Sequence, residues 1–238
     1  MNPQIIFENK FFLVINKPAG LLVHKSKIKG SELSKEKTLV DWLLVRYPRI
    51  KNVGDDQENR PGIVHRLDKD TSGVMLVPKT QDYFLYLKKL FQEHKVKKTY
   101  LAIVYGVPKK GEGVISKPIG IKDGTTKRSV HSIKMAKTAE TYYKILKTID
   151  FLQRSSASLL EVKPATGRTH QIRIHLASIG HPILGDSLYG NKLSTALSKQ
   201  LSISRQMLHA SSIEFEEKHG NLSRFDTEPA ADLATIIS

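Results

Sequence analysis

Apolar residues along the chain follow either the two-residue repeat of a strand or the wider repeat of a helix. Strand-like alternation or short apolar runs cover residues 5–17 (broken at 8–10), 21–24, 74–77, 98–106, 139–149, 156–163 and 207–215. Helical spacing predicts helices that begin near Thr38 and Thr80, and further helices over 169–179 and 191–205. Because strands outnumber helices and the helices are scattered among them, we predict an α+β fold with a mixed, mainly antiparallel sheet.

The segments between these elements give no sign of a second domain. No linker rich in Gly, Pro or Ser divides the chain, and no internal repeat is recognisable. We therefore predict a single domain over residues 1–238, of which about 219–238 form a weakly patterned tail. Residues 25–37 and 107–137 are polar, basic connections and are predicted to lie at the surface.

The charge of the chain narrows the choice of partner. Lys and Arg number 38 against 23 Asp and Glu, which gives a net charge of +15. Such an excess favours a polyanion, because each cation that neutralises a phosphate releases a counterion. We expect a nucleic acid rather than a membrane surface or a charge that only serves solubility.

The composition excludes several classes of chemistry. The chain contains no cysteine, which excludes disulfides, zinc–thiolate sites and thiol catalysis. No apolar run approaches the ~20 residues that span a membrane, and the first residues lack the basic and apolar parts of a signal peptide. We therefore expect a cytoplasmic protein that binds no membrane, and we expect a monomer.

Two stretches hold more polar side chains than folding requires. Residues 62–73 run Gly-Ile-Val-His-Arg-Leu-Asp-Lys-Asp-Thr-Ser-Gly directly before an apolar strand, which is typical of a loop that carries chemistry on a rigid scaffold. Residues 164–175 open a predicted helix whose polar positions lie on two neighbouring faces. These are Arg168, Gln171 and His175 on one face, and Thr169 and Arg173 on the other. Ile172, Leu176 and Ile179 form the apolar stripe of this predicted helix. Some of the cations lie close to that stripe, and a half-buried arginine needs a carboxylate partner.

Each feature also has a purely structural explanation. An aspartate such as Asp68 in a loop flanked by glycines is more often a turn former than a catalyst. A polar helix face is more often solvated than functional, and Tyr100, near the start of a predicted strand, has the ordinary role of packing. The loop 181–190 fits a structural turn at least as well as a functional one. The residue patterns alone therefore leave the site open.

Six stretches together resemble the RluA family of RNA pseudouridine synthases, in that family's order and spacing. They are Asn16–Gly20, His65–Gly73, Lys98–Ala102, Gly167–Leu176, His181–Gly190 and Arg205–Ala210. The chain resembles the compact members without an N-terminal S4-type domain. The resemblance implies the pseudouridine synthase fold, with helices and loops flanking a central cleft. It also implies an isomerase that converts uridine in structured rRNA or tRNA to pseudouridine.

The resemblance implies roles for individual residues. Asp68 matches the catalytic aspartate, and Tyr100 matches the tyrosine that stacks on the target base and can move its proton. Arg173 matches the basic residue that pairs with the aspartate, and Arg66 matches the arginine that helps to extrude the target nucleotide. We add further RNA contacts from the helix motif and from the basic run at 127–131, namely Arg168, His170, Gln171, Lys127 and Arg128.

The chemistry of these residues suits the reaction. Isomerisation breaks the N1–C1′ bond, rotates the uracil and rejoins it through C5, so we expect neither a cofactor nor a metal. The aspartate must be ionised whether it attacks C1′ or removes the 2′ proton, and the sequence does not choose between these. Burial raises a carboxylate pKa and a guanidinium within ~4–6 Å lowers it, which gives Arg173 a physical task. Flipping a stacked base costs roughly a few kcal/mol, which Arg66 can offset.

Three other functions are compatible with parts of the pattern. Asp68-Lys69-Asp70 is a D-x-D sequence that would hold a metal in a nucleotide-sugar transferase, but no nucleotide-binding glycine loop accompanies it. A two-carboxylate glycosidase needs a second acid across a cleft, and nothing nominates one. A non-catalytic RNA-binding module would have no need of Asp68, Tyr100 and Arg173 together.

Overall fold

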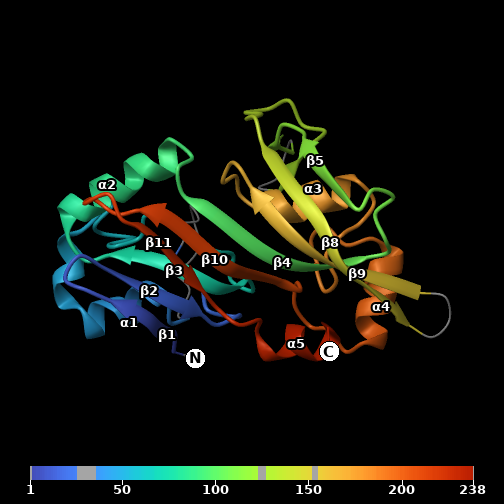
Figure 1. Cartoon of the computed structure of the whole chain (residues 1–238), viewed down its shortest axis with the longest axis horizontal. Coiled ribbons are helices and arrows are strands. Elements are labelled where there is room, and N and C mark those ends of the chain that lie inside the picture. The colour runs from blue at the N-terminus through green and yellow to red at the C-terminus, as the bar shows by residue number, and fades with distance from the viewer. Residues whose placement is uncertain (1, 26–35, 123–126, 152–154, 238) are drawn as a thin grey trace. The chain divides into compact units, whose positions relative to one another are not determined.

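The computed structural model of the chain describes residues 2–25, 36–122, 127–151 and 155–237 (Figure 1). The chain folds into two compact units. Unit 1 comprises Met1–Lys97 and Ala210–Glu228, and unit 2 comprises Lys98–His209 and Pro229–Ser238. That the two units together make one domain stays a prediction. Among the described helices, none is long and apolar enough to cross a membrane.

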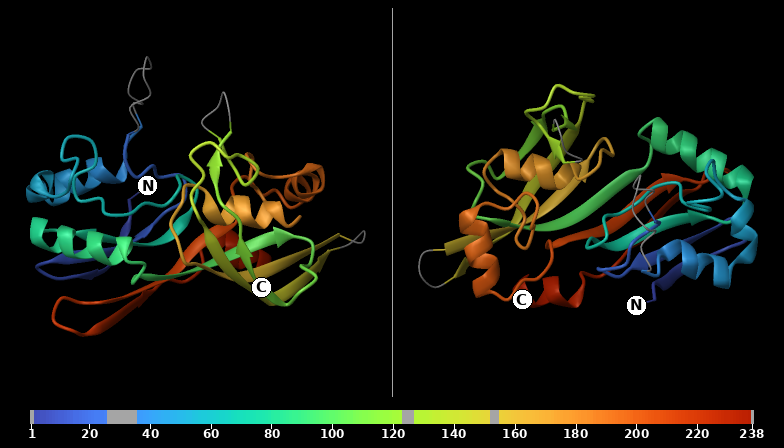
Figure 2. Two further views of the ribbon diagram at one scale, coloured as in Figure 1. Left: turned by 90° about the horizontal axis from the view of Figure 1, so that it is seen from above. Right: turned by 180° about the vertical axis from the view of Figure 1, so that it is seen from behind.

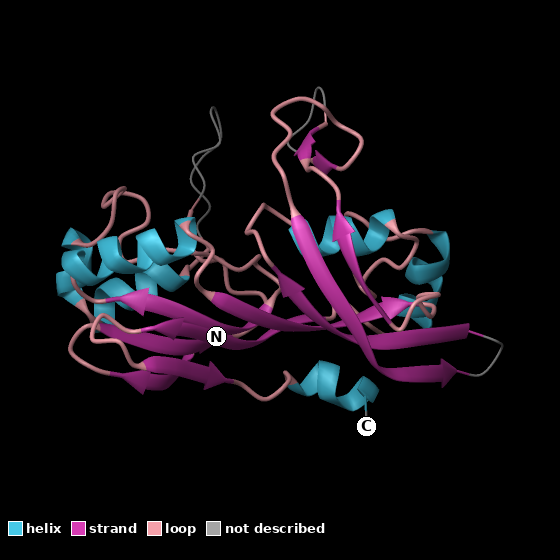
Figure 3. Cartoon of the chain, turned by 45° about the horizontal axis from the view of Figure 1, so that its top comes forward, coloured by secondary structure: helices cyan, strands magenta, loops and turns pink. Residues whose placement is uncertain are grey.

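Unit 1 is a sheet with helices on one side. Strands β1 (Gln4–Glu8), β2 (Phe12–Lys17) and β3 (Ser72–Pro78) pair antiparallel in that order. From Ala210 onward, β10 (Leu208–Glu216) lies beside β3 and forms an antiparallel hairpin with β11 (Leu222–Asp226), coloured red in Figure 2. Helices α1 (Leu39–Arg46) and α2 (Gln81–Gln92) lie on the same side of the strands (Figure 3), and the 3-10 helix η1 (Pro48–Asn52) follows α1.

The start of α1 follows directly from its sequence. Thr38 is the N-cap, and its hydroxyl accepts from the Asp41 N–H while the Asp41 carboxylate accepts from the Thr38 N–H, so both residues form one capping box. The first two N–H groups of the helix donate to the carbonyls of Leu22 and Val23. The predicted strand over 21–24 is therefore wrong, because its carbonyls serve the helix start and Leu22 makes only an isolated bridge.

Unit 2 holds a second set of antiparallel strands. Their order is β4 (Lys97–Tyr105), β9 (Ser155–Pro164), β8 (Glu140–Phe151) and β5 (Glu112–Ser116). Between β5 and β8, the short strands β6 (Gly120–Ile121) and β7 (Arg128–Ser129) pair with each other. Helix α3 (Gln171–Ser178) lies on one side of the strands and α5 (Ala231–Ile237) on the other in Figure 3, and α4 (Lys192–Gln200) follows α3 in the chain. The α+β class with mainly antiparallel pairing is confirmed.

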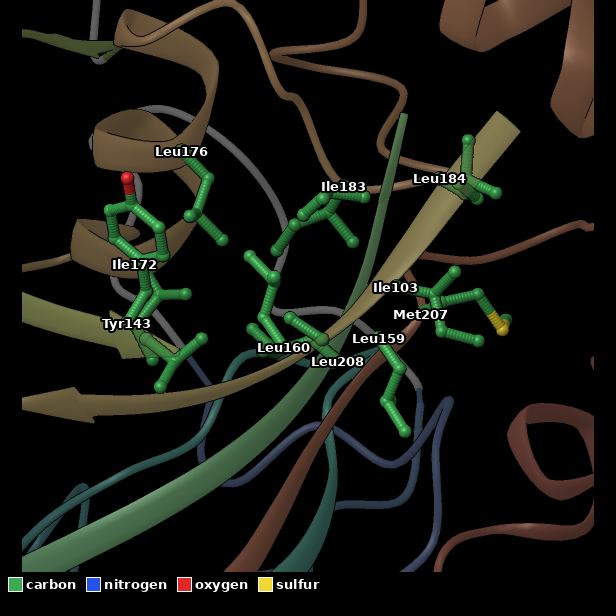
Figure 4. Packing of buried hydrophobic residues seen from close by; sticks show 14 of the residues in the cluster. Ile103, Tyr143, Leu159, Leu160, Ile172, Leu176, Ile183, Leu184, Met207 and Leu208 are labelled. Carbon is green, nitrogen blue, oxygen red and sulfur yellow. The ribbon is translucent and has the colours of Figure 1, made fainter. Parts of the chain in front are cut away.

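The apolar core of unit 2 fixes the orientation of α3 (Figure 4). Ile172 and Leu176, four residues apart on the helix, are buried against Ile103 of β4 and Leu160 of β9. Ile179 packs partly buried against the same cluster, which confirms the predicted apolar stripe of the helix. Since this stripe faces the strands, the polar residues of α3 occupy its remaining faces.

Residues 219–238 hold two elements that the sequence pattern did not predict. Strand β11 alternates only between exposed and half-buried residues, and α5 buries Leu233 as its one fully covered side chain among the described residues. Neither element therefore carries the apolar repeat on which a prediction depends. The strand predicted over 207–215 corresponds to β10, and β11 follows it.

Candidate active site

Residues 62–73 form the loop that leads into β3, and we call them the Asp68 loop. The apolar side chains of Ile63 and Leu67 are buried in unit 1 and hold the loop from within. Thr71 donates its N–H to the carbonyl of Asp68 at 3.2 Å, which closes a turn at the end of the loop. Asp68 itself is half-buried.

The Asp68 loop joins β3 at a position that only glycine can occupy. Gly73 has a φ of +114°, in the region that favours glycine, and a Cβ there would overlap the backbone of Ala210 at the start of the neighbouring stretch of β10. The end of the Asp68 loop is thus fixed to two adjacent strands.

A buried ammonium group anchors the Asp68 loop from the other side. Lys17, at the end of β2, is 0% exposed, and its Nζ donates to the carbonyls of Pro18 at 2.8 Å, Leu21 at 2.9 Å and Lys69 at 2.9 Å. The N–H of Gly20 donates to the same Lys69 carbonyl at 2.9 Å. Burying a charged group costs free energy unless hydrogen bonds replace the lost water. The three carbonyls, which we call the carbonyl cage, provide those hydrogen bonds. The cage fixes the Lys69–Asp70 peptide, the second peptide after Asp68.

Arg66 is exposed, and a histidine outside the predicted site holds it. Its Nη1 donates to Nε2 of His24 at 3.1 Å, and Nδ1 of His24 contacts the carbonyl of Lys25 at 3.0 Å. Burial, and then the charges of Arg66 and Arg60, lower the pKa of His24 below its ordinary value of 6.5, against the opposing effect of the Lys25 carbonyl. His24 is therefore neutral at pH 7.

His65, the residue before Arg66, has a structural role. Its Nε2 accepts the N–H of Leu76 in β3 at 2.9 Å, and its ring stacks on Phe91 of α2 with centroids 4.7 Å apart. A ring held on both its edge and its face in this way ties the Asp68 loop to a strand and a helix of unit 1.

Arg173 of α3 is buried and pairs with a carboxylate for which no role was predicted. Its Nε and Nη2 donate to the two oxygens of Asp186 at 2.7 and 2.8 Å, a bidentate contact. Burial alone would raise the pKa of Asp186, but Arg173 and the N–H groups of Leu188 and Tyr189 bring it below 3.8. The expectation that a covered arginine needs a carboxylate partner is confirmed, with Asp186 as such a partner.

The side-chain amide of Gln171 makes all of its hydrogen bonds within unit 2. Its Oε1 accepts from the Thr166 hydroxyl at 2.6 Å and from the Arg168 N–H at 3.0 Å. Its Nε2 donates to the Glu140 carbonyl at 2.9 Å and to the Thr141 hydroxyl at 3.0 Å. These four contacts use every donor proton and both lone pairs of the amide. These contacts give Gln171 a structural role, and its role as an RNA contact stays a prediction.

His175, one turn further along α3, continues the same network. Thr141 accepts from Gln171 and donates to Nδ1 of His175 at 2.9 Å, and Nε2 of His175 donates to the Lys117 carbonyl at 2.9 Å. Burial lowers the pKa of His175 below its ordinary value of 6.5. The chain of hydrogen bonds ties α3 to β8, and the lowered pKa favours a neutral imidazole.

Arg168 and His170 lie in the turn before α3 rather than on the helix. The helix begins at Gln171 because His170 takes a left-handed conformation with φ 56°. The prediction that Arg168, Gln171 and His175 share one helix face is therefore wrong. Arg168 donates its Nε to the Thr138 carbonyl at 3.1 Å, and Nδ1 of His170 contacts the Tyr189 hydroxyl at 2.9 Å.

The remaining predicted residues lie on strands of unit 2. Tyr100 is half-buried in β4, opposite Val162 of β9. Lys127 is exposed and Arg128 is half-buried at the start of β7, in a stretch from 127 to 138 that holds four Lys or Arg and no Asp or Glu. Of the two connections predicted to lie at the surface, 25–37 lies outside the described residues over 26–35, and 107–137 lies outside them over 123–126.

Two sets of predicted residues result. Arg66 and Asp68 share one loop in unit 1. In unit 2, Arg173 and His170 meet at the loop 181–190, since the Arg173 guanidinium lies 5.2 Å from the Tyr189 ring centroid and His170 contacts the hydroxyl of that tyrosine. The pairing of Arg173 with Asp68, and the approach of Tyr100 to both, stay predictions. In the part of the chain that the structure describes, no group of three or more His, Asp or Glu side chains is arranged to hold a metal.

Comparison with known proteins gives a consistent picture. Residues 11–178 match the sequence profile of a family described as RNA pseudouridylate synthase. A protein of Zymomonas mobilis named ribosomal large subunit pseudouridine synthase D is 37% identical over 98% of this chain and 71% of its own length. An uncharacterized RNA pseudouridine synthase of Aquifex aeolicus is 42% identical over 84% of this chain. This chain spans 60% of the length of the Aquifex protein.

Comparison with solved structures also finds a pseudouridylate synthase. The solved structure of human RNA pseudouridylate synthase domain containing 1 superposes with a TM-score of 0.75 at 25% identity, over 95% of this chain and 83% of the other.

Proposed function

The chain belongs to the RNA pseudouridylate synthase family, and from this premise we propose that it isomerises uridine to pseudouridine in a folded RNA. The observation that carries the proposal is the anchored Asp68 loop, in which a buried lysine and two strands fix the backbone around the half-buried carboxylate of Asp68. The family match spans Asp68, Tyr100 and Arg173 together.

Asp68 is the proposed catalytic residue. As a carboxylate it either attacks C1′ of the target uridine or removes the 2′ proton, and in both routes the N1–C1′ bond breaks. The freed uracil turns, and C5 bonds to C1′ as the bond from Asp68 to C1′ breaks in the first route, or as C2′ regains its proton in the second. C5 then loses its proton and N1 gains one, so the product is an isomer of the substrate. The carbonyl cage around Lys17 keeps the Asp68 backbone from following the substrate during these steps, which is the pre-organisation that catalysis requires.

Arg173 is the proposed partner that keeps Asp68 ionised. Asp186 takes the Nε and Nη2 edge of the guanidinium, and this bidentate contact sets the direction of Nη1. A guanidinium held in this way can face a second carboxylate with little entropy lost. Tyr100 supplies the aromatic face against which the uracil turns, and its hydroxyl is the candidate carrier of the C5 proton.

The RNA contacts proposed outside the reacting groups are cationic. Arg66 is exposed on the Asp68 loop, where it can fill the space left by the extruded nucleotide and offset the roughly few kcal/mol that flipping costs. Lys127, Arg128 and Arg168 add positive charge for the phosphates. Large-subunit ribosomal RNA is the first substrate to test, since the Zymomonas relative carries that name, and transfer RNA is the second.

The decisive experiment compares two aspartates of the same loop. Asp68→Asn should abolish tritium release from RNA labelled at C5 of uridine, while RNA affinity stays within about twofold, because only the reacting carboxylate is lost. Asp70→Asn, two residues along, is the matched control and should stay active. Activity should also survive chelation by EDTA.

Each rival function predicts a different result. Full activity in Asp68→Asn contradicts the proposal. Loss of activity in both variants, together with inhibition by EDTA, favours the metal-binding D-x-D reading. Tight RNA binding without tritium release from any RNA favours a non-catalytic RNA-binding module. Mapping of pseudouridine in total RNA with and without the gene then identifies the substrate.

A further inference from the structure

His24 makes two hydrogen bonds that fix which of its ring nitrogens carries the proton. The carbonyl of Lys25 can only accept, so the Nδ1 that lies 3.0 Å from it must be protonated. The guanidinium of Arg66 can only donate, so the Nε2 that lies 3.1 Å from Nη1 must be bare. The contact with Arg66 therefore exists only while His24 is neutral.

We propose that His24 is a positioning residue for Arg66 of the Asp68 loop. While the imidazole is neutral it holds the Arg66 guanidinium, and on protonation it releases it. The proposal rests on the proposed function, because it takes nucleotide extrusion as the task of Arg66. It adds a residue of the segment 21–24, outside the Asp68 loop, and a pH dependence to that task.

An arginine side chain that moves freely on a surface is poorly suited to displace a stacked base. Its side chain carries about 2 kcal/mol of rotamer entropy, which is lost when the guanidinium enters an RNA stack. Arg66 is exposed, but its Nη1 is held by a half-buried ring that is itself tied to the backbone at Lys25. Much of the ordering is thus done before RNA arrives, and the gain appears in the extrusion step rather than in the first encounter.

Burial and the nearby cations together keep His24 neutral. Burial is the largest influence that lowers its pKa, and the cations of Arg66 and Arg60 act in the same direction. The Lys25 carbonyl and the carboxylate of Asp56 oppose them. Asp41 of α1 lies 4.0 Å from Lys25 Nζ and shields that neighbouring cation.

These groups give the pH dependence its direction. Above 6.5 His24 is neutral and the contact is intact. As the pH falls through the lowered pKa, the added proton on Nε2 faces a donor, and the contact is lost.

Two substitutions separate the hydrogen bond from the ring. His24→Gln places an amide oxygen, which does not titrate, near the position of Nε2, whereas His24→Leu keeps the volume and removes the acceptor. Turnover is measured for wild type and both variants on a folded RNA between about pH 5 and 8, and on a single-stranded oligonucleotide of the same sequence.

We expect His24→Leu to lower kcat on folded RNA by about tenfold, the effect of one hydrogen bond to a charged group, with KM changed less than twofold. His24→Gln should keep most of the wild-type rate and remove the part of the acid-side fall that the wild type owes to His24. On the single-stranded oligonucleotide the three proteins should be alike, because no stacked base has to be displaced. Equal rates and equal pH profiles for wild type and His24→Leu on folded RNA would overturn the proposal.

A second measurement is independent of turnover. In RNA-free protein, nitrogen NMR should find His24 protonated on Nδ1 only, and Arg66→Ala should raise the His24 pKa toward 6.5 by removing a nearby cation. A His24 pKa that Arg66→Ala leaves unchanged would refute the contact itself. The proposed function fails by a different result, the absence of pseudouridine formation by the wild type.

Discussion

The Asp68 loop and the segment 164–175 are equally crowded with polar side chains in the sequence, yet the fold uses them in opposite ways. In the Asp68 loop, the hydrogen bonds described above run mainly to backbone atoms, since Lys17 and Gly20 hold the carbonyl of Lys69 and Thr71 holds that of Asp68. In the segment 164–175, the side chains themselves make the hydrogen bonds that hold the fold, because Gln171, His175 and Arg173 all bond within unit 2.

The difference separates a loop that carries chemistry from a helix that supports it. A loop fixed through its backbone can offer its side chains to a substrate without losing its shape. A helix fixed through its side chains has few left to offer, but it holds those few in a set direction. Polar density in a sequence therefore indicates where hydrogen bonds concentrate, and the fold decides whether substrate or protein receives them.

The largest expected effect on stability comes from breaking the buried ion pair between Arg173 of α3 and Asp186. Asp186→Asn leaves the buried Arg173 without its counter-charge and should cost about 3–5 kcal/mol of unfolding free energy. The matched control is Asp232→Asn, which breaks another bidentate Arg–Asp contact of unit 2, with Arg205, but at a carboxylate 47% exposed. That variant should cost no more than about 1 kcal/mol. Urea unfolding measures both, and equal costs would show that burial does not set the strength of the pair.

The next effect is on the cage that fixes the Asp68 loop. Lys17→Met removes the donor of three carbonyls and should destabilise the protein by about 2–3 kcal/mol. Isomerisation should fall further than stability explains, because the Lys69–Asp70 peptide next to Asp68 is released. Lys69→Met is the control, since it keeps the caged carbonyl and loses only an exposed ion pair with Glu36. Comparable loss of activity in the two variants would contradict a specific effect of the carbonyl cage on the site.

A smaller effect concerns pH and the supporting helix. The folded state holds His175 neutral with its pKa lowered by burial, whereas the unfolded chain binds a proton near 6.5. Stability should therefore be complete above 6.5 and fall as the pH drops toward the lowered pKa, by at most about 1.4 kcal/mol per pH unit for one proton.

His175→Gln tests this pH dependence by removing the titrating ring. The variant should flatten the dependence of urea unfolding on pH, and His24→Gln, which removes another histidine of lowered pKa, allows the two contributions to be subtracted. Stability that rises on acidification in the wild type would contradict the assigned neutral tautomers.

Much of this arrangement could be predicted from the sequence. The capping box at Thr38, the apolar stripe through Ile172 and Leu176, and the antiparallel strands all follow from local pattern. The buried cage around Lys17 could not be predicted in this way, because a lysine beside Pro and Gly looks like an exposed turn residue until the carbonyls that surround it are known.

Long-range partners explain the other gaps. Asp186 lies 13 residues after Arg173 and His24 lies 42 before Arg66, and no short-range pattern links either pair. The predicted start of α3 is too early because His170 takes a left-handed conformation, which interrupts the helix and which the apolar pattern does not reveal. The roles of Asp68 and Tyr100 came from family resemblance, since their residue types alone favoured a turn and a packing residue.

The smallest effect on stability is expected for Lys127→Ala, which should nevertheless change the salt dependence of RNA binding. Lys127→Ala removes an exposed cation from a stretch without carboxylates, so unfolding should be unchanged while the slope of log affinity against log salt falls by about one. Lys144→Ala is the matched control, because Lys144 is equally exposed in unit 2 but pairs across strands with Glu112 and Glu161, which repel phosphate. Its salt slope, measured by fluorescence anisotropy with the same RNA, should stay at the wild-type value. If both variants lose the same slope, RNA responds to the net charge of +15 as a whole. The stretch around Lys127 would then have no more claim to be a contact surface than the sheet.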